Sequence, residues 1–389
     1  MVGKVVRGIA GGLVAVVGVL ALGPAALLLV VGETRAGRLA GGAALACLAA
    51  GIRGGVLVAR RPHPRPWPWR GAAGLCLTTA AALAVALART TPRADPDREF
   101  GLQSRFVGGL AVPRYSPAHL VPESDQVKLG VTLATRPLFW SSRARTIREV
   151  TTGLYRSIEA DPDARGLRPV THFAALGLVG VIPRPGHYWT YVPKTLPGEA
   201  PGAIVFLHGN GGSFQVVPYV LGPLAEASRC VIICPTFGFG FWGEGGAEAV
   251  DRAWADASAR WPIDRSRVYL GGISDGGVGV TRSAAAHPGR YRGLIYVSPT
   301  LRLDELAAPD YTRGWKGRPI LVLQGDRDGN VPKSSVDPAV ALLRDRAGAE
   351  VDYRVFAGED HFLFFSRRRE LTGLIGDWMA RPGRPPAPP

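Results

Sequence analysis

Residues 268–280 read VYLGGISDGGVGV, a strand-like run followed by a glycine-rich turn and a stretch that can form a helix. Ser274 lies at the centre of the turn, in a Gly-x-Ser-x-Gly pattern completed by Gly272 and Gly276. The pattern is typical of a nucleophile elbow, a sharp turn that raises a serine hydroxyl above the edge of a sheet. Glycine is required on either side because strand and helix pass too close to the serine to admit a Cβ. A plain glycine-rich turn is the alternative, and the flanking elements favour the nucleophile.

From residue 187 onward, short apolar runs alternate with stretches that can form helices. We expect strands at 188–192, 203–207, 230–234, 268–271, 293–298, 319–324 and 351–356, and helices at 216–227, 247–261, 276–285, 338–346 and 367–379. Short apolar strands between helices predict an α/β fold, in which helices cover both faces of a mostly parallel sheet. We therefore place a domain of this class at residues 187–380, followed by a disordered proline-rich tail at 381–389.

Four motifs each follow an expected strand: HGNGG at 208–212, GISDG at 272–276, GDRDGNVP at 325–332 and GEDH at 358–361. In residue types and order they resemble the α/β-hydrolase family, and the resemblance extends over residues 185–380. The lead-in YWTYVP at 188–193 is loosely similar to members of the feruloyl-esterase and polyester-depolymerase type. The resemblance implies an α/β-hydrolase fold and the activity of a serine esterase.

The hydroxyl of Ser274 needs a base within hydrogen-bonding reach, because a serine is a poor nucleophile at neutral pH. Of the seven histidines, His361 lies in a loop between the last strand and a helix, where its imidazole can reach the elbow. A carboxylate must then orient the imidazole and stabilise its charged form. We assign this role to Asp328, which stands three residues before Val331 as the family's acid does, and Asp326 is its rival.

An oxyanion formed on the substrate carbonyl needs N–H donors that are already in place. Asp275 supplies one from its backbone at the start of the helix after the elbow, where the helix dipole adds to the effect. The second is expected from Asn210 or Gly211, in the glycine-rich turn after the strand 203–207. The resemblance implies that the neighbouring His208 is structural.

The loop PTFGFGFWGEGG, residues 235–246, is the candidate for contact with the substrate. Four aromatic residues alternate with glycine in it: Phe237, Phe239, Phe241 and Trp242. They are candidates for lining an acyl or aromatic pocket or for touching a nearby membrane, and packing as a cover over the sheet fits the pattern equally well. Residues 300–318 are too few for a large helical lid, so we expect an open cleft.

Residues 1–90 are predicted to anchor the chain in a membrane. Three segments are candidate spans: 8–31, which carries no charge, 39–59, which Arg53 interrupts, and 71–88, which is again uncharged. About 20 apolar residues cross a bilayer as a helix, and the apolar segment 8–31 is too long for a cleaved signal peptide. We expect three spans, with two spans or a buried helical hairpin as alternatives.

Four arginines crowd the loop before the last span: Arg60, Arg61, Arg65 and Arg70. Positively charged loops stay in the cytoplasm, so the last span runs outward. Three arginines that follow this span reduce the difference in positive charge between its two ends. The catalytic domain is therefore expected outside the cytoplasm, on a multi-pass protein of the cell membrane. Residues 91–99 are expected to form a linker, and 100–186 an N-terminal extension of the catalytic domain whose role the sequence does not specify.

The formal net charge of +15 does not indicate nucleic acid as a partner, because the arginines are spread along the chain and several flank apolar segments. Cys47 and Cys76 lie in apolar segments, and Cys230 and Cys234 share one expected strand. Residues four apart in a strand are separated by about 13 Å, beyond disulfide reach. No Cys or His spacing indicates a metal, and the assigned chemistry needs no cofactor.

The sequence thus predicts a membrane-anchored serine hydrolase that cleaves carboxylic esters through an acyl-enzyme. An extracytoplasmic acyltransferase would use the same triad with an acceptor other than water. A non-catalytic binding protein of the same fold is the alternative from another class, and the presence of every triad residue type argues against it. The expected partners are an ester substrate and the lipid bilayer, and the oligomeric state stays open.

Overall fold

The computed structural model describes residues 25–60, 98–107, 121–133, 143–170, 186–196, 200–238 and 240–381. The chain divides into two compact units, Met1–Ala94 with Pro113–Leu133 and Asp95–Val112 with Ala134–Pro389. The expected extension 100–186 is therefore shared between the two units. Five segments that the sequence assigned lie wholly or mostly outside the described residues: 8–31, 61–70, 71–88, 91–99 and 381–389.

In the first unit, Asp125 of α4 (Glu123–Leu133) joins that helix to the start of α2 (Arg35–Arg60). One carboxylate oxygen accepts the N–H of Glu33 at 2.7 Å, and the other accepts the hydroxyl of Thr34 at 2.5 Å. Lys128, one turn further along α4, pairs with the Glu33 carboxylate at 2.6 Å. The side chains of α4 therefore satisfy polar groups that the N-terminus of α2 would leave unpaired.

Among the helices that the structure describes, none is both long enough and apolar enough to cross a membrane. The predicted span 39–59 belongs to this described part and lies within α2. It is helical as expected, but Arg53 falls inside it and much of the remainder is alanine and glycine. The expectation of a transmembrane helix at 39–59 is therefore not supported.

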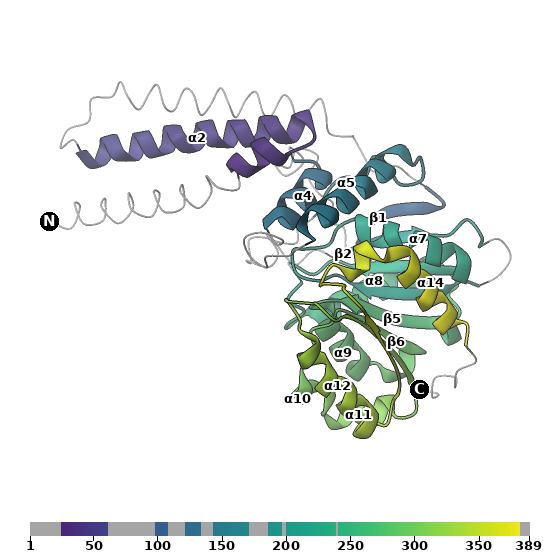
Figure 1. The fold of residues 1–389 in the computed structure, drawn as a ribbon. Helices are drawn as coiled ribbons and strands as arrows, with labels where there is room; N and C mark the ends of the chain where they lie inside the picture. The colour runs from purple at the N-terminus through teal and green to yellow at the C-terminus, as the bar shows by residue number, and fades with distance from the viewer. Residues whose placement is uncertain are drawn as a thin grey trace. The chain divides into compact units, whose positions relative to one another are not determined.

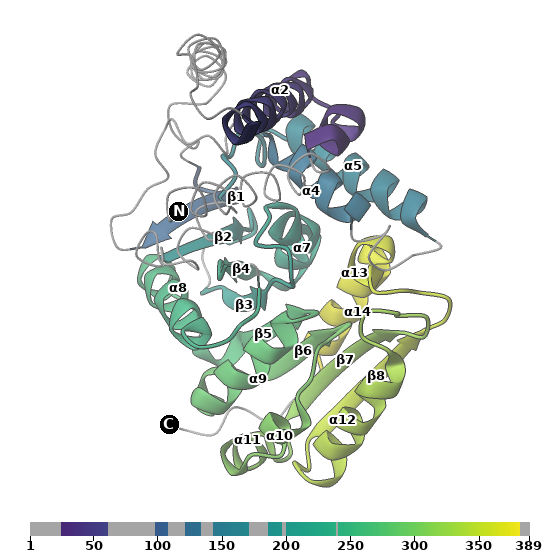
Figure 2. The same cartoon turned by 90° about the vertical axis from the view of Figure 1, so that its left-hand side faces the viewer.

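The second unit is built on one eight-stranded sheet with the order β1-β2-β4-β3-β5-β6-β7-β8 (Figure 2). Its strands are β1 (Gly101–Val107), β2 (Gly186–Val192), β3 (Gly202–Leu207), β4 (Cys230–Pro235), β5 (Val268–Ile273), β6 (Gly293–Val297), β7 (Pro319–Gly325) and β8 (Glu350–Phe356). Only β2 runs against its neighbours, and every pair from β4 to β8 is parallel. The mostly parallel sheet predicted from the apolar runs is confirmed.

Helices cover both faces of this sheet (Figure 1). On one face, α7 (Val216–Ser228) and α14 (Arg368–Met379) pack against each other, and α5 (Ala144–Ala160) joins them through α7 and α13 (Leu363–Ser366). The other face carries α8 (Gly246–Arg260), α9 (Gly276–Ala286), α10 (Leu303–Leu306), α11 (Pro309–Trp315) and α12 (Lys333–Asp345). The layered α/β architecture expected from the alternation is therefore observed.

Every residue of the central strands β3, β4, β5 and β6 is buried. Their side chains pack with those of the covering helices in one apolar cluster that includes Val205, Leu270, Tyr296 and Trp254. Close packing of this kind resists displacement of individual strands. The loops at the carboxyl ends of these strands are thus mounted on a rigid support.

Two of the differences from the expectation concern the edge strand β1 and the start of helix α12. The strand β1 was not predicted, because the polar residues Gln103, Ser104 and Arg105 interrupt its apolar pattern, and as an edge strand it pairs only with β2. Helix α12 begins at Lys333 rather than at 338, directly after Pro332. Pro332 is the residue before the first helical turn, and Pro338, at which the sequence placed the start, lies inside the helix.

Candidate active site

Ser274 lies between the end of β5 and the start of α9, with a φ of 53° in the left-handed region. Its own N–H donates to the carbonyl of Val297 at 3.0 Å, and its carbonyl accepts N–H groups from Gly277 at 2.8 Å and Thr300 at 2.9 Å. A non-glycine residue in this conformation costs about 1 to 3 kcal/mol and persists only where the surroundings impose it. These three hydrogen bonds impose it here, as the elbow motif predicts.

The two glycines of the elbow are required by close backbone contacts. A Cβ on Gly272 would lie 2.7 Å from the carbonyl oxygen of Gly276, and one on Gly276 would lie 2.4 Å from that of Leu207. Gly209, in the turn after β3, comes equally near, since its Cβ would lie 2.9 Å from the Cβ of Ser274. The elbow and the turn after β3 therefore touch at the serine.

The structure brings Ser274, His361 and Asp328 together in one chain of hydrogen bonds. The Nε2 atom of His361 lies 2.9 Å from the Oγ atom of Ser274, and its Nδ1 atom lies 2.8 Å from Oδ2 of Asp328. The imidazole is 13% exposed and the carboxylate 0%. The histidine can thus receive a proton from the serine on one nitrogen while the other stays bonded to a buried carboxylate.

Of the two candidate acids, only Asp328 faces the histidine. Besides the imidazole, it accepts the backbone N–H groups of Asn330 at 2.9 Å and Val331 at 2.8 Å through Oδ1. Asp326 instead accepts the N–H of Gly358 at 2.7 Å and is exposed. Asp326 is therefore a loop-bridging residue.

Gln324 is a neighbour of the triad that the sequence interpretation did not assign. Its Nε2 atom donates to the carbonyl of Val331 at 2.8 Å and lies 3.3 Å from Oδ2 of Asp328. The side chain is fully buried at the end of β7. A single amide at the end of the otherwise apolar run PILVLQG is the signal that could have identified it.

The predicted oxyanion donors lie at the two backbone segments that meet at Ser274. Asp275 directly precedes α9, so its backbone N–H lies at the positive end of the helix dipole. Asn210 and Gly211 follow His208 and Gly209 in the turn after β3. The second donor is still either Asn210 or Gly211, because both belong to that turn.

His208 joins the turn after β3 to the aromatic loop, residues 235–246. Its Nδ1 atom bonds the carbonyl of Gly209 at 2.9 Å, and its Nε2 atom accepts the N–H of Phe237 at 3.1 Å. Gly240 packs on the same turn, because a Cβ there would lie 2.2 Å from the carbonyl oxygen of Gly209. With both ring nitrogens engaged, His208 has the structural role that the resemblance implied.

The aromatic loop is mostly cover for the sheet rather than a pocket wall. Trp242 has no exposed surface, stacks on Phe237 at 5.4 Å between ring centroids, and donates its indole N–H to the carbonyl of His208 at 2.8 Å. Phe237 is 7% exposed. The expectation that these two residues line a substrate pocket is corrected: both are core residues. Phe241 is 63% exposed and stays a candidate, whereas Phe239 lies outside the described residues.

Two buried histidines give the domain a predictable pH dependence of stability. Burial lowers the pKa of His208 to about 4 and that of His187 to about 3. In the unfolded chain both rings take up a proton below about pH 6.5, and in the folded protein they stay neutral. Because the unfolded state binds more protons, the free energy of unfolding decreases as the pH falls from about 6.5 towards 4, by up to about 1.4 kcal/mol per pH unit for each histidine.

Urea denaturation at pH 7, 6 and 5 measures this loss of stability. The carboxylates with lowered pKa values lose their contribution only at lower pH, so the interval between pH 6.5 and 5 reports mainly the histidines. His187→Gln keeps a partner for Thr236, which now lies 2.8 Å from the ring. For this variant, we expect the free energy of unfolding to decrease less steeply with falling pH than in the wild type. An equally steep decrease would show that His187 does not contribute to the pH dependence.

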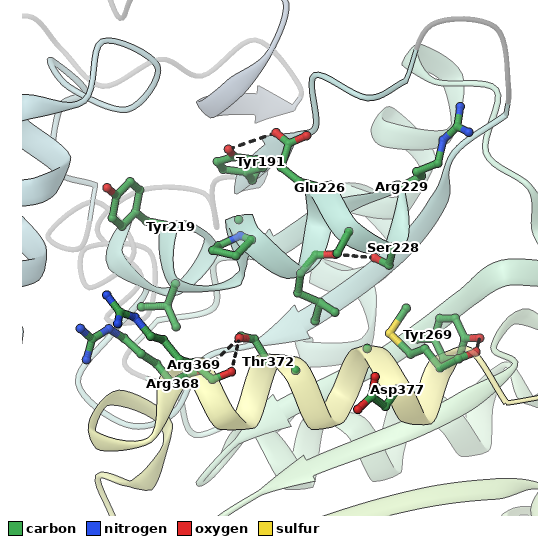
Figure 3. Close-up of a pocket in the computed structure, with 18 of the residues that line it drawn as sticks. Tyr191, Tyr219, Glu226, Ser228, Arg229, Tyr269, Arg368, Arg369, Thr372 and Asp377 are labelled. Atoms are coloured by element: carbon green, nitrogen blue, oxygen red, sulfur yellow. Dashed lines mark hydrogen bonds between the residues drawn. The ribbon is translucent and has the colours of Figure 1, made fainter.

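A groove of about 1150 Å³ lies between α7 and α14 (Figure 3). Tyr191 donates its hydroxyl to Glu226 on one wall, and Arg368 and Asp377 belong to the opposite wall. None of the triad residues lines it. Tyr269, which lines the groove, is the second residue of β5, whereas Ser274 follows the last residue of that strand. The groove thus lies at the amino-terminal edge of the parallel strands, away from Ser274. The groove therefore does not serve the triad.

Among the residues the structure describes, no cluster of three or more His, Cys, Asp and Glu side chains is arranged to bind a metal ion. The chemistry available at this site is that of the hydrogen-bonded serine, histidine and aspartate. With the elbow after β5, the acid after β7 and the histidine after β8, the chain has an α/β-hydrolase-like fold.

Comparison with solved structures finds similar chains at low sequence identity. A thermostable esterase is 20% identical with a TM-score of 0.43, over 51% of this chain and 59% of the other. A hyperthermophilic esterase from the archaeon Pyrobaculum calidifontis is 18% identical with a TM-score of 0.41, over 50% and 80% of the two chains. The acylaminoacyl peptidase of Pyrococcus horikoshii is 17% identical with a TM-score of 0.43, over 52% and 41%.

No family model matches this chain, and no curated protein sequence matches it. The chain spans 59% of the thermostable esterase and 41% of the acylaminoacyl peptidase. At such identities a fold is shared by proteins of many functions. The functional assignment must therefore come from the geometry at Ser274.

Proposed function

We propose that this chain is a serine hydrolase that cleaves carboxylic esters through an acyl-enzyme. The observation that carries the proposal is the unbroken hydrogen-bond chain from Ser274 through His361 to Asp328, with separations of 2.9 Å and 2.8 Å. A buried carboxylate, an imidazole and a strained serine in this order have the geometry of nucleophilic catalysis.

In the first half of the reaction, Oγ of Ser274 attacks the ester carbonyl while its proton passes to Nε2 of His361. The oxyanion of the tetrahedral intermediate is stabilised by the N–H of Asp275 and one from the turn at Asn210 and Gly211, where each donor contributes about 2.7 to 4 kcal/mol. The imidazolium is stabilised by Asp328 and returns its proton to the departing alcohol. The serine is left acylated.

In the second half, water enters where the alcohol left. His361 takes a proton from this water as its oxygen attacks the acyl carbon, and the resulting intermediate collapses to a carboxylic acid when the proton is returned to Ser274. Asp328 keeps the imidazole in one orientation through both halves, because its remaining lone pairs are engaged by the N–H groups of Asn330 and Val331. The same residues therefore act twice.

Hydrolysis of p-nitrophenyl esters of increasing acyl length by the full-length protein tests the proposal. We expect saturable turnover with kcat in the ordinary range of about 1 to 1000 per second for a preferred ester. An added alcohol should divert only part of the acyl group. Predominant transfer to the alcohol in water would identify an acyltransferase instead, and the absence of any turnover from a folded protein would contradict the proposal.

We further propose that the N-terminal region attaches this hydrolase to the cell membrane, with the catalytic domain outside the cytoplasm. The support is in the sequence alone, in the uncharged stretches 8–31 and 71–88 and the arginine-rich loop between the spans. Single cysteines introduced at 62–68 and at 95–99 test it in intact cells. Labelling of the first loop by a membrane-impermeant maleimide would overturn this topology.

A further inference from the structure

Glu359 stands two residues before His361 and carries a buried carboxylate, whose side chain is 6% exposed. Three groups surround that carboxylate. Arg143 donates to Oε2, Ser366 donates its hydroxyl to the same oxygen at 2.6 Å, and Arg367 lies 3.8 Å from Oε1. A charge in so dry a position is stable only with such partners. The ion pair between Arg143 and Glu359 thus holds the loop that carries His361.

The backbone of Glu359 links the histidine loop to the loop of the acid. Its carbonyl accepts the N–H of Arg327, the residue before Asp328, at 2.9 Å. A second link joins Gly358 to the Asp326 carboxylate at 2.7 Å. A displacement of Glu359 would therefore change the separation between His361 and Asp328, which is 2.8 Å.

Arg143 belongs to the N-terminal extension rather than to the segment that resembles hydrolases. It immediately precedes α5, whose buried face includes Ile147, Leu154 and Ile158. This helix packs against α13, the short helix that begins two residues after His361 (Figure 2). The extension therefore contacts the histidine loop on both sides, by an ion pair before the histidine and by packing after it.

We propose that Arg143 and Glu359 are positioning residues, through which the extension keeps His361 in the orientation that the reaction needs. The inference rests on the proposed hydrolase function. It assigns a role to the segment 143–160, which the sequence interpretation left without one. A catalytic fragment that begins after this segment would keep all three triad residues and lose most of its activity.

The test compares the double variant Arg143→Ala with Glu359→Gln and four single variants of the full-length protein: Arg143→Ala, Arg143→Lys, Glu359→Gln and Arg145→Ala. Arg145 is the matched control, because it is the same residue type and is exposed in the first turn of the same helix. We measure kcat and KM for p-nitrophenyl acetate, the rate of serine labelling by a fluorophosphonate, and the thermal unfolding midpoint. Turnover is expressed per serine that the fluorophosphonate titrates, so that unfolded protein does not count.

A small misplacement of a catalytic group reduces rates by up to about 100-fold. We expect Arg143→Ala and Glu359→Gln to lower kcat and the labelling rate in parallel by at least about tenfold, with KM within about twofold. Arg143→Lys should recover part of the loss, and Arg145→Ala should match the wild type. The double variant Arg143→Ala with Glu359→Gln should lose little more than either single variant, because both changes remove one interaction.

A merely structural pair would lower the unfolding midpoint and leave kcat per titrated serine unchanged, which would overturn the proposal. If Arg143→Ala does not fold, Glu359→Gln decides, because glutamine keeps the side-chain volume and can still accept the hydroxyl of Ser366. Wild-type protein without turnover and without labelling would refute the hydrolase function and this inference with it. Active wild type with unaffected variants would refute only the positioning role.

Discussion

Ser274→Ala is expected to reduce kcat for ester hydrolysis by roughly a million-fold, to the level that binding and the oxyanion donors alone sustain. His361→Ala should have an effect of similar size, because the serine is activated only through the hydrogen bond of 2.9 Å to the Nε2 atom of His361. The two changes should not add, since each disables the same unit. Steady-state hydrolysis of p-nitrophenyl acetate is measured for the wild type, the two single variants and the double variant.

The folded state of these variants is checked by circular dichroism and by the urea midpoint. Neither side chain belongs to the apolar core, so both variants should unfold near the wild type. Ser274→Ala retaining a tenth of the wild-type kcat would mean that another group performs the reaction. His361→Ala retaining it would mean that the serine has a different base.

Asp328→Asn is expected to lower kcat by about 10⁴-fold, because an amide in this place favours the wrong tautomer of the imidazole. The carboxylate has no exposed surface and lies 2.8 Å from the Nδ1 atom of His361, so no water can replace it. Asp326→Asn is the matched control, since it changes the same residue type in the same loop. Within the described part of the chain, the Asp326 carboxylate accepts one hydrogen bond, from the N–H of Gly358, and its variant should stay within about tenfold of the wild type.

Measurement of kcat for these two variants shows which aspartate orients His361. The sequence alone favoured Asp328 and did not exclude Asp326. The order Asp328→Asn far below Asp326→Asn is the predicted result. The reverse order would show that the loop rearranges when substrate binds and would exchange their roles. Equal, small effects would mean that His361 acts without an orienting acid.

The elements around the site could be predicted because each has a local signature. The elbow needs glycine at 272 and 276 because neighbouring backbone comes too close to admit a Cβ at either position, and those residues are visible in the sequence. The acid follows the apolar strand β7 and the histidine follows the more polar strand β8, so their meeting at one edge of the sheet follows from parallel strands alone. The identity and the order of these residues were therefore sufficient to predict that they meet in one site.

The elements that escaped prediction depend on contacts between distant parts of the chain. Arg143 and Glu359 are 216 residues apart, and nothing near either one marks them as partners. Trp242 reads as a binding residue in its glycine-rich loop, and its burial results from packing against Gly279 of α9. The edge strand β1 is polar enough to resemble a loop until β2 pairs with it. Contacts between residues that are far apart in the sequence cannot be predicted from local sequence patterns.

The activation of Ser274 is tested most directly by the reaction of the full-length protein with a fluorophosphonate, followed by mass spectrometry of the labelled peptide. We expect one adduct, on Ser274, which forms rapidly in the wild type and is lost in both Ser274→Ala and His361→Ala. Labelling that persists in His361→Ala, or an adduct on a different serine, would contradict the central claim that the hydrogen-bond chain through His361 activates Ser274.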